Sequence, residues 1–476
     1  MSPSLTAAHQ PTAPQEPSSR SATLRRENRR ILGLALPNII TNITVPLLGM
    51  VDMAIMGHLD ATHIGAVSIG TSIFNLIYWN FGFLRMGTSG LTAQAYGARN
   101  LAEAAAVLVR SLTIALTVAA SLLLLQRPIA HLSTLLLNGS DEVMQLALTY
   151  FYIRIWAAPA TLGLYGLKGW FIGMQNSKLP MWIAIFINVV NIVMSLLLVV
   201  VWQKGIAGVA LGTVMAQYSG LLVSLYFAHR YYGRLLRRHI DLHRALRWDS
   251  MRQFFNLNLD IFLRTVCLST VFTFITAASG KIGDNFLAID ALLLQFFTLF
   301  SYIMDGFAYA GESLVGRHIG AHNPTALQRC VRLLMVWGAG LTIVFTAAYA
   351  LGGNAFLHLL SNDETLLQEA QTYLFWILII PVCGCAAFLF DGIFVGATAS
   401  RAMLVSMLVA TAVFFGSYYG LKAALLPSYG DNAQRWNNIL FTAFMLYLAL
   451  RGIMQAALLR HSVYRRAQPT PLSTND

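Results

Sequence analysis

The stretch LALPNIITNITVPLLGMVDMAIMGH, from Leu34 to His58, decides how the chain folds. Its roughly 25 mostly apolar residues are enough to cross a bilayer core of about 30 Å as one tilted helix. Pro37 and Pro46 interrupt the helical hydrogen bonding and predict a hinge. Asp52 lies deep within the stretch, where a charge costs a few kcal/mol unless a partner, water or a proton compensates it. We expect this carboxylate to exchange an ion; the alternative is an acid that only hydrogen-bonds a neighbouring helix.

The composition excludes a water-soluble globular protein. Hydrophobic residues make up 57% of the chain, charged residues only 11%, and the mean hydropathy is +0.61. The apolar residues come in many blocks of about 20, separated by short polar joints, as in helical multi-pass membrane proteins. The sequence shows no nucleotide-binding loop, nucleophile motif or metal-ligand spacing. We therefore expect no enzyme activity, no cofactor and no bound metal.

Polar stretches divide the chain into two halves. The longest one between apolar blocks is rich in arginine and lies at the middle of the chain. The prediction is an all-α membrane protein with twelve transmembrane helices in two six-helix lobes. Its parts are a disordered cytoplasmic tail (1–33), an N-terminal lobe (34–228), a basic cytoplasmic linker (229–256), a C-terminal lobe (257–460) and a second cytoplasmic tail (461–476). Within the first half we expect one helix over about 64–88 and a loop over 132–144.

Short matches between the halves indicate a tandem duplication. Gly97-Ala98-Arg99-Asn100 matches Gly320-Ala321-His322-Asn323 at an offset of 223 positions, and Phe171-Ile172-Gly173 matches Phe394-Val395-Gly396 at the same offset. Six helices is an even number, so the two lobes should have the same orientation, with a cavity between them. Most of the 32 Lys and Arg residues fall on one side of the predicted topology, which places both termini in the cytoplasm.

Four motifs in fixed order carry a family resemblance. They are Pro46–Asp60 (PLLGMVDMAIMGHLD), Leu91–Ala98 (LTAQAYGA), Asp305–Ala310 (DGFAYA) and Phe390–Thr398 (FDGIFVGAT). Together they resemble the MATE family of multidrug and toxic compound extrusion transporters, and its DinF branch in particular. The resemblance covers nearly the whole chain after the N-terminal tail. It implies antiport in the inner or plasma membrane, with organic, mostly cationic compounds leaving by alternating access as protons or sodium ions enter.

The resemblance also implies a coupling site around Asp52, which occupies the position of the family's ion-carrying carboxylate. Asn188, Asn191 and Ser195 share one helical face at spacings of three and four residues. Thr213, on the next helix, corresponds to another polar family position. Many relatives carry a second aspartate where this chain has Ser195, so a complete sodium site is in doubt. We expect the proton as coupling ion, with sodium as the alternative, in a transporter that is a monomer among membrane lipids.

Acidic residues in the second half leave several roles open. We expect Asp305 and Asp391, together with Met53, to line the substrate cavity, with packing as the alternative for both acids. The roles of Asp290 and Glu312 are undecided. Glu312 could reach interfacial water or the nearby Arg317. Asp260 has an expected partner one helical turn away, Arg264.

Basic residues at membrane depth bear on the alternatives to drug export. We expect them to snorkel or to act as counter-charges, because they would repel a cationic drug: Arg85, Arg154 and Lys168. A flippase for lipid-linked precursors, from the related superfamily, would need a cationic cavity. Arg154 and Lys168 favour that function, whereas Asp52 with Asp391 opposes it. A channel or scaffold is disfavoured by the duplication and the buried carboxylate.

Overall fold

The computed structural model describes residues 20–57, 61–136, 140–361, 363–429 and 433–468, and within these ranges it contains helices and no strand. The first half contains α1 (Arg20–Gly57), α2 (Ala61–Asn80), α3 (Phe83–Gly97), α4 (Leu101–Leu124), α5 (Gln126–Leu136), α6 (Asp141–Arg154), η1 (Ile155–Ala157), α7 (Ala158–Gly173), α8 (Lys178–Leu196), η2 (Leu197–Val201), α9 (Gly205–His239) and α10 (Leu242–Ala245). The second half contains α11 (Trp248–Ile282), α12 (Asp284–Gly320), α13 (Pro324–Leu360), α14 (Glu364–Gln371), α15 (Leu374–Gly396), α16 (Ser400–Tyr429), α17 (Ala433–Ser462) and η3 (Tyr464–Ala467).

The helices account for the predicted membrane spans. Among the described residues, nine helices are long and apolar enough to cross a bilayer. The predicted number of twelve is reached when α1 and two interrupted pairs, α2 with α3 and α6 with α7, are each counted as one span. The first pair breaks at Phe81-Gly82, while the second is joined by the short 3-10 turn η1. The predicted class, an all-α membrane protein with twelve spans, is confirmed.

Several predicted boundaries are wrong in detail. α1 begins at Arg20 rather than Leu34, because the charged residues before Leu34 are good helix formers that continue the helix. The predicted loop over 132–144 is mostly helical, since α5 and α6 occupy both of its ends. The predicted helix over 64–88 breaks near Gly82. The basic linker is largely absorbed into α9 and α11, with the short α10 between them.

The internal repeat is visible in the backbone. Arg99 and His322, 223 positions apart, both adopt positive φ, at 56° and 49°. The residues that follow them, Asn100 and Asn323, each cap the next helix by accepting a backbone N–H bond of 3.0 Å. A second pair of positive-φ residues keeps the same offset: Gln175 and Thr398. The same loop geometry therefore recurs at matching places in both halves.

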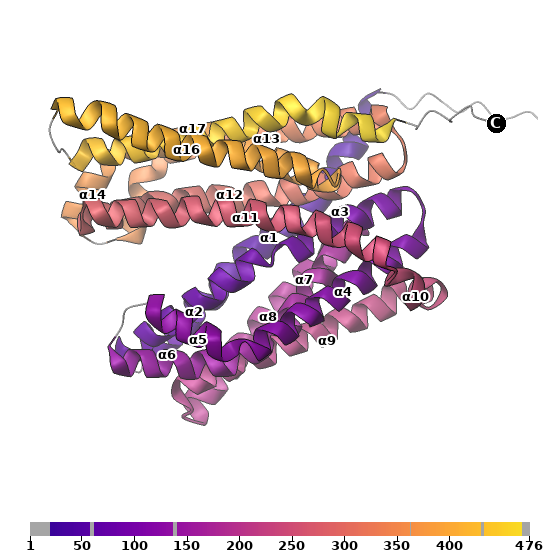
Figure 1. Ribbon diagram of the computed structural model, residues 1–476, viewed down its shortest axis with the longest axis horizontal. Helices are drawn as coiled ribbons and strands as arrows, with labels where there is room; N and C mark the ends of the chain where they lie inside the picture. Colours follow the sequence, from indigo (N-terminus) through magenta and orange to yellow (C-terminus); the bar gives the residue numbers. More distant parts are fainter. Residues whose placement is uncertain (1–19, 58–60, 137–139, 362, 430–432, 469–476) are drawn as a thin grey trace, which may run out of the picture.

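The helices form two groups, the N-terminal lobe (α2–α9) and the C-terminal lobe (α11–α17). Figure 1 shows that the groups lie close together at the end that holds α3 and α10 and diverge toward α5, α6 and α14. α1 runs between them. Its residues Ile31, Leu34 and Ala35 belong to the hydrophobic core of the C-terminal lobe, while α1 also packs on α8 and α2. α1 thus contacts both lobes.

Candidate ion-coupling and substrate site

Three of the predicted coupling residues lie together between α8 and α9. Asn191, Ser195 and Thr213 are all buried, and Asn191 Nδ2 donates to Thr213 Oγ1 at 3.1 Å. Gly212 allows this approach, because a Cβ there would lie 2.5 Å from Ser195 Oγ. Asn191 Oδ1 and Ser195 Oγ have no hydrogen-bond partner among the described residues. Buried polar atoms are nearly always paired, so these two oxygens mark a place that an ion, water or another side chain completes.

α1 lies next to this cluster. Asn188 Nδ2, on α8, donates to the carbonyl oxygen of Thr44 at 3.0 Å, two residues before Pro46. The backbone of Asp52 and Met53 follows in the last two turns of α1. The side chains of both residues lie outside the described part of the structure, so their roles stay predictions. Four neutral polar residues therefore lie on α8 and α9, and one of them, Asn188, contacts the helix that carries the predicted carboxylate.

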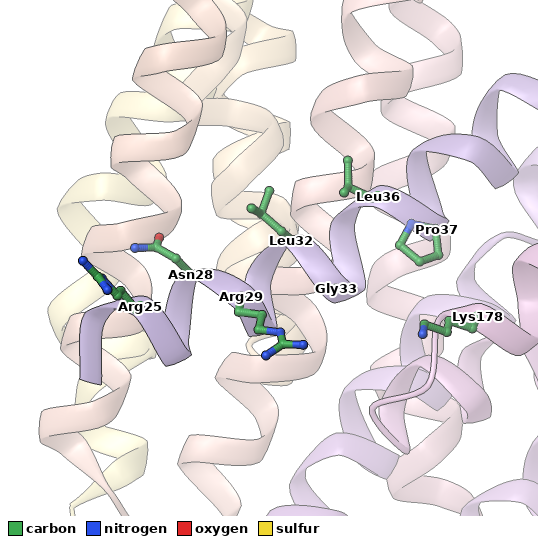
Figure 2. A pocket seen from close by; sticks show the side chains of 8 residues that line it. All are labelled: Arg25, Asn28, Arg29, Leu32, Gly33, Leu36, Pro37 and Lys178. Carbon is green, nitrogen blue, oxygen red and sulfur yellow. The ribbon is translucent and has the colours of Figure 1, made fainter. Parts of the chain in front are cut away.

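The first predicted hinge position borders a groove. The groove has a volume of about 560 Å³, and Figure 2 shows the side chains that line it: Arg25, Asn28, Arg29, Leu32, Gly33, Leu36, Pro37 and Lys178. Pro37 has no N–H, so the carbonyl of Gly33 lacks its helical donor. A Cβ built on Gly33 would meet nothing within 4 Å. α1 therefore combines a weakened turn with free space beside it, which is what a helix needs in order to bend.

Asp391, which the sequence predicts to line the substrate cavity, is paired with basic side chains of two other helices, and its place at a cavity stays a prediction. It is 7% exposed and forms ion pairs with Arg264 of α11 and Arg451 of α17, the latter with Nη2 2.6 Å from Oδ2. Gln455 Nε2 donates to Oδ1 at 2.7 Å. Two guanidinium groups compensate one carboxylate, as membrane depth demands. The arginines are 127 and 60 positions away in sequence, so local spacing could not reveal them.

Two other acids of the C-terminal lobe have neutral partners. The predicted pair of Asp260 with Arg264 is wrong, because Arg264 points to Asp391 on another helix, and Asp260 instead accepts a 2.8 Å bond from Ser400 Oγ. Asp290, whose role the sequence left open, is 2% exposed and accepts a 2.8 Å bond from Asn437 Nδ2.

Glu312 joins the two lobes. It is 1% exposed, and its Oε2 lies 3.0 Å from Nη1 of Arg85 on α3, while Ser89 also donates to it. The predicted contacts with interfacial water or Arg317 are wrong, because the glutamate points across the lobe boundary. Arg85 is thus the counter-charge of Glu312, which is one of the two roles that the sequence predicted for it. Its Cζ also lies 4.0 Å from the ring centre of Tyr309.

Lys168 and Asp305 face the same boundary. Lys168 extends from α7 until its Nζ is 5.6 Å from the ring centre of Tyr309 on α12. Asp305, one turn earlier on α12, is half-buried and feels the charges of Arg85 and Asp391. The role of Asp305 in a substrate cavity stays a prediction.

The MatE family model matches residues 37–197 and 261–416, more than half of the chain and one stretch in each half. The chain belongs to the MatE family. It is 37% identical over 449 residues to DNA damage-inducible protein F of Escherichia coli strain K12. This alignment covers 92% of this chain and 93% of that protein. It is also 25% identical over 334 residues to human multidrug and toxin extrusion protein 1, spanning 70% of this chain and 57% of that protein.

Solved structures share the fold. A multidrug resistance MATE family transporter in an outward-facing conformation superposes with a TM-score of 0.81, at 18% identity, covering 93% of this chain and 97% of that one. The resemblance to MATE transporters and to DinF is confirmed. The protein is a multi-pass membrane transporter of the multidrug and toxin extrusion family and a homologue of DinF.

Proposed function

We propose that this MatE protein is a secondary antiporter of the inner membrane that exports organic, mostly cationic compounds in exchange for protons. The observation that carries the proposal is the pair of buried oxygens without partners, Asn191 Oδ1 and Ser195 Oγ, beside the helix that carries Asp52. A carboxylate at membrane depth that takes up a proton loses its charge, and with it part of its attraction for a cation. Protonation on one side and release on the other then couple the two fluxes.

The proton is favoured over sodium by the charges available. The described residues on α8 and α9 are an amide and two hydroxyls, so in this proposal the negative charge is the single one that Asp52 would bring. Sodium prefers several oxygen ligands and more than one carboxylate to offset the loss of its water shell, whereas a proton needs one carboxylate and polar neighbours. Sodium coupling remains the alternative that the experiment distinguishes.

Proteoliposomes test the coupling. We expect an imposed pH gradient without sodium to drive export of a dye cation, Asp52→Asn to abolish it, and the matched variant Asp284→Asn, at an exposed helix start, to leave it unchanged. If only a sodium gradient drives export, the coupling ion is sodium and not the proton. Full activity of a well-expressed Asp52→Asn protein would overturn the assignment of Asp52.

The proposed topology places both termini and the basic segment around α10 in the cytoplasm. Figure 1 places α10 and the last turns of α17 on the side where the lobes touch, so this arrangement makes the structure outward-facing. The four native cysteines are free and can be replaced. A cysteine at Arg237 on α9 should then resist an impermeant thiol reagent in intact cells. Labelling from outside would reverse the orientation.

A further inference from the structure

Two charged side chains at the lobe boundary have no hydrogen-bond or ion-pair partner in the described part of the chain. Lys168 of α7 and Asp305 of α12 are both half-buried, and neither forms a hydrogen bond or ion pair with any residue in the ranges that the structure describes. The ammonium lies 5.6 Å from the centre of the Tyr309 ring. The lysine therefore points across the boundary toward the other lobe.

The charged groups that Lys168 feels are not all paired. Arg85 uses Glu312 as its counter-ion, and Asp391 is shared by Arg264 and Arg451. Lys168 lies near enough to feel Arg85, Asp305 and Glu312, but of these acids Glu312 is already paired. The described groups that act on one another here are two bases and two acids: Arg85, Lys168, Asp305 and Glu312. Because Arg85 and Glu312 compensate each other, Lys168 and Asp305 are left as two opposite charges at membrane depth, and each costs several kcal/mol unless a group of opposite sign joins it.

We propose that Lys168 binds the anionic group of an amphoteric substrate, a carboxylate or sulfonate, while Asp305 attracts the positive group of the same molecule. An ammonium with three donors suits a carboxylate, and the Tyr309 ring beside it suits an aromatic substrate body. The proposal rests on the proposed export function and deepens it. A purely cationic compound would bind Asp305 but not Lys168. The two side chains together therefore favour compounds that carry both a positive and a negative charge.

The test uses two dyes that differ only in the anionic group. Rhodamine B carries a free carboxylate, and its ethyl ester is a plain cation. In cells lacking their own efflux pumps, we expect Lys168→Gln to lower rhodamine B export at least about tenfold while ester export stays within about twofold. Lys168→Arg should restore most of the loss. Lys204→Gln, which removes an exposed lysine ahead of α9, is the matched control and should export both dyes normally.

Binding to the purified protein separates this inference from the export function. We expect fluorescence anisotropy to show that Lys168→Gln weakens the binding of rhodamine B at least about tenfold and leaves the binding of the ester unchanged. If the wild type exports neither dye, the export proposal fails, and this binding difference alone decides the role of Lys168. Equal losses for both dyes in Lys168→Gln, or no loss for either, would overturn the anion site.

Discussion

The two lobes share a backbone but differ in their polar chemistry. Asn191 and Ser195 of α8 correspond, at the offset of 223, to Phe414 and Tyr418 of α16. Ser195 Oγ has no described partner, whereas Tyr418 Oη accepts a 2.7 Å bond from Trp436 Nε1 and Phe414 is fully buried. One copy of the repeat therefore keeps a polar place that can bind an ion, and the other fills the same place with packed rings. The duplicated scaffold alone does not determine where the site lies.

A second pair of equivalent positions repeats the contrast. Lys168 and Asp391 are also 223 positions apart. The next residue in each lobe packs alike: a Cβ at Gly169 would lie 2.3 Å from a carbonyl oxygen of α3, and one at Gly392 2.1 Å from a carbonyl oxygen of α12. The backbone contact has been kept while the neighbouring charge has changed sign. Two arginines pair with the acid, whereas the lysine forms no hydrogen bond or ion pair with the residues that the structure describes.

The strongest test of this contrast compares Asp391→Asn with Lys168→Gln. Asp391→Asn leaves two buried arginines without their carboxylate, so we expect a loss of about 3–5 kcal/mol in unfolding free energy. Lys168→Gln removes a charge that has no described partner and should not destabilise the protein. Denaturation of both variants in detergent measures the difference. Equal destabilisation would mean that Lys168 has a structural counter-ion.

The ion pair between the lobes should show a smaller effect in a double-mutant cycle. Arg85→Met or Glu312→Met alone leaves one buried charge, and we expect each to cost about 3 kcal/mol. The double variant replaces the pair by apolar side chains and should recover most of that loss. The same denaturation measurement gives the coupling energy. Additive losses would show that the two side chains stabilise the protein independently.

The sequence predicted what depends on local pattern, and missed what depends on contacts between distant helices. The apolar blocks predicted the spans, and the recurring motif at Gly97 and Gly320 predicted the repeat, because each of these features depends on a short stretch of sequence. The cluster of Asn191 with Ser195 could also be predicted, because their helical spacing places them on one face. The partners of Asp391 and Glu312 could not be predicted, because the residues near an acid in sequence do not show which distant helix carries its arginine.

Where the lobes touch, the repeat is symmetric, and two glycines test it. A Cβ at Gly97 would lie 2.1 Å from the carbonyl oxygen of Arg317, and one at Gly320 would lie 2.0 Å from that of Gln94. We expect Gly97→Ala and Gly320→Ala to cost a similar 1–3 kcal/mol, roughly, by overpacking. Spin labels at the exposed equivalents of the two loops, residues 98 and 321, should move apart in both variants.

Gly340→Ala supplies the control for these glycines, because a Cβ there would meet nothing within 4 Å. It should leave both the stability and the label distance unchanged. A strong effect at only one of Gly97 and Gly320 would show that the lobes do not meet symmetrically at this end.

The smallest effect on stability should come from Ser195, and it separates a binding place from a packing place. Ser195→Ala removes a buried hydroxyl that has no described partner, so we expect the unfolding free energy to stay within about 0.5 kcal/mol or to rise. Tyr418→Phe, at the equivalent position, leaves Trp436 Nε1 without its acceptor and should cost about 1–2 kcal/mol.

Transport should respond to the two substitutions in the opposite order. Because Ser195 Oγ lies in the proposed coupling cluster, Ser195→Ala should slow proton-driven export severalfold, while Tyr418→Phe leaves the rate per folded molecule unchanged. Proteoliposome flux normalised to folded protein measures this. A Ser195→Ala protein that loses stability but transports normally would make the serine a packing residue like its counterpart.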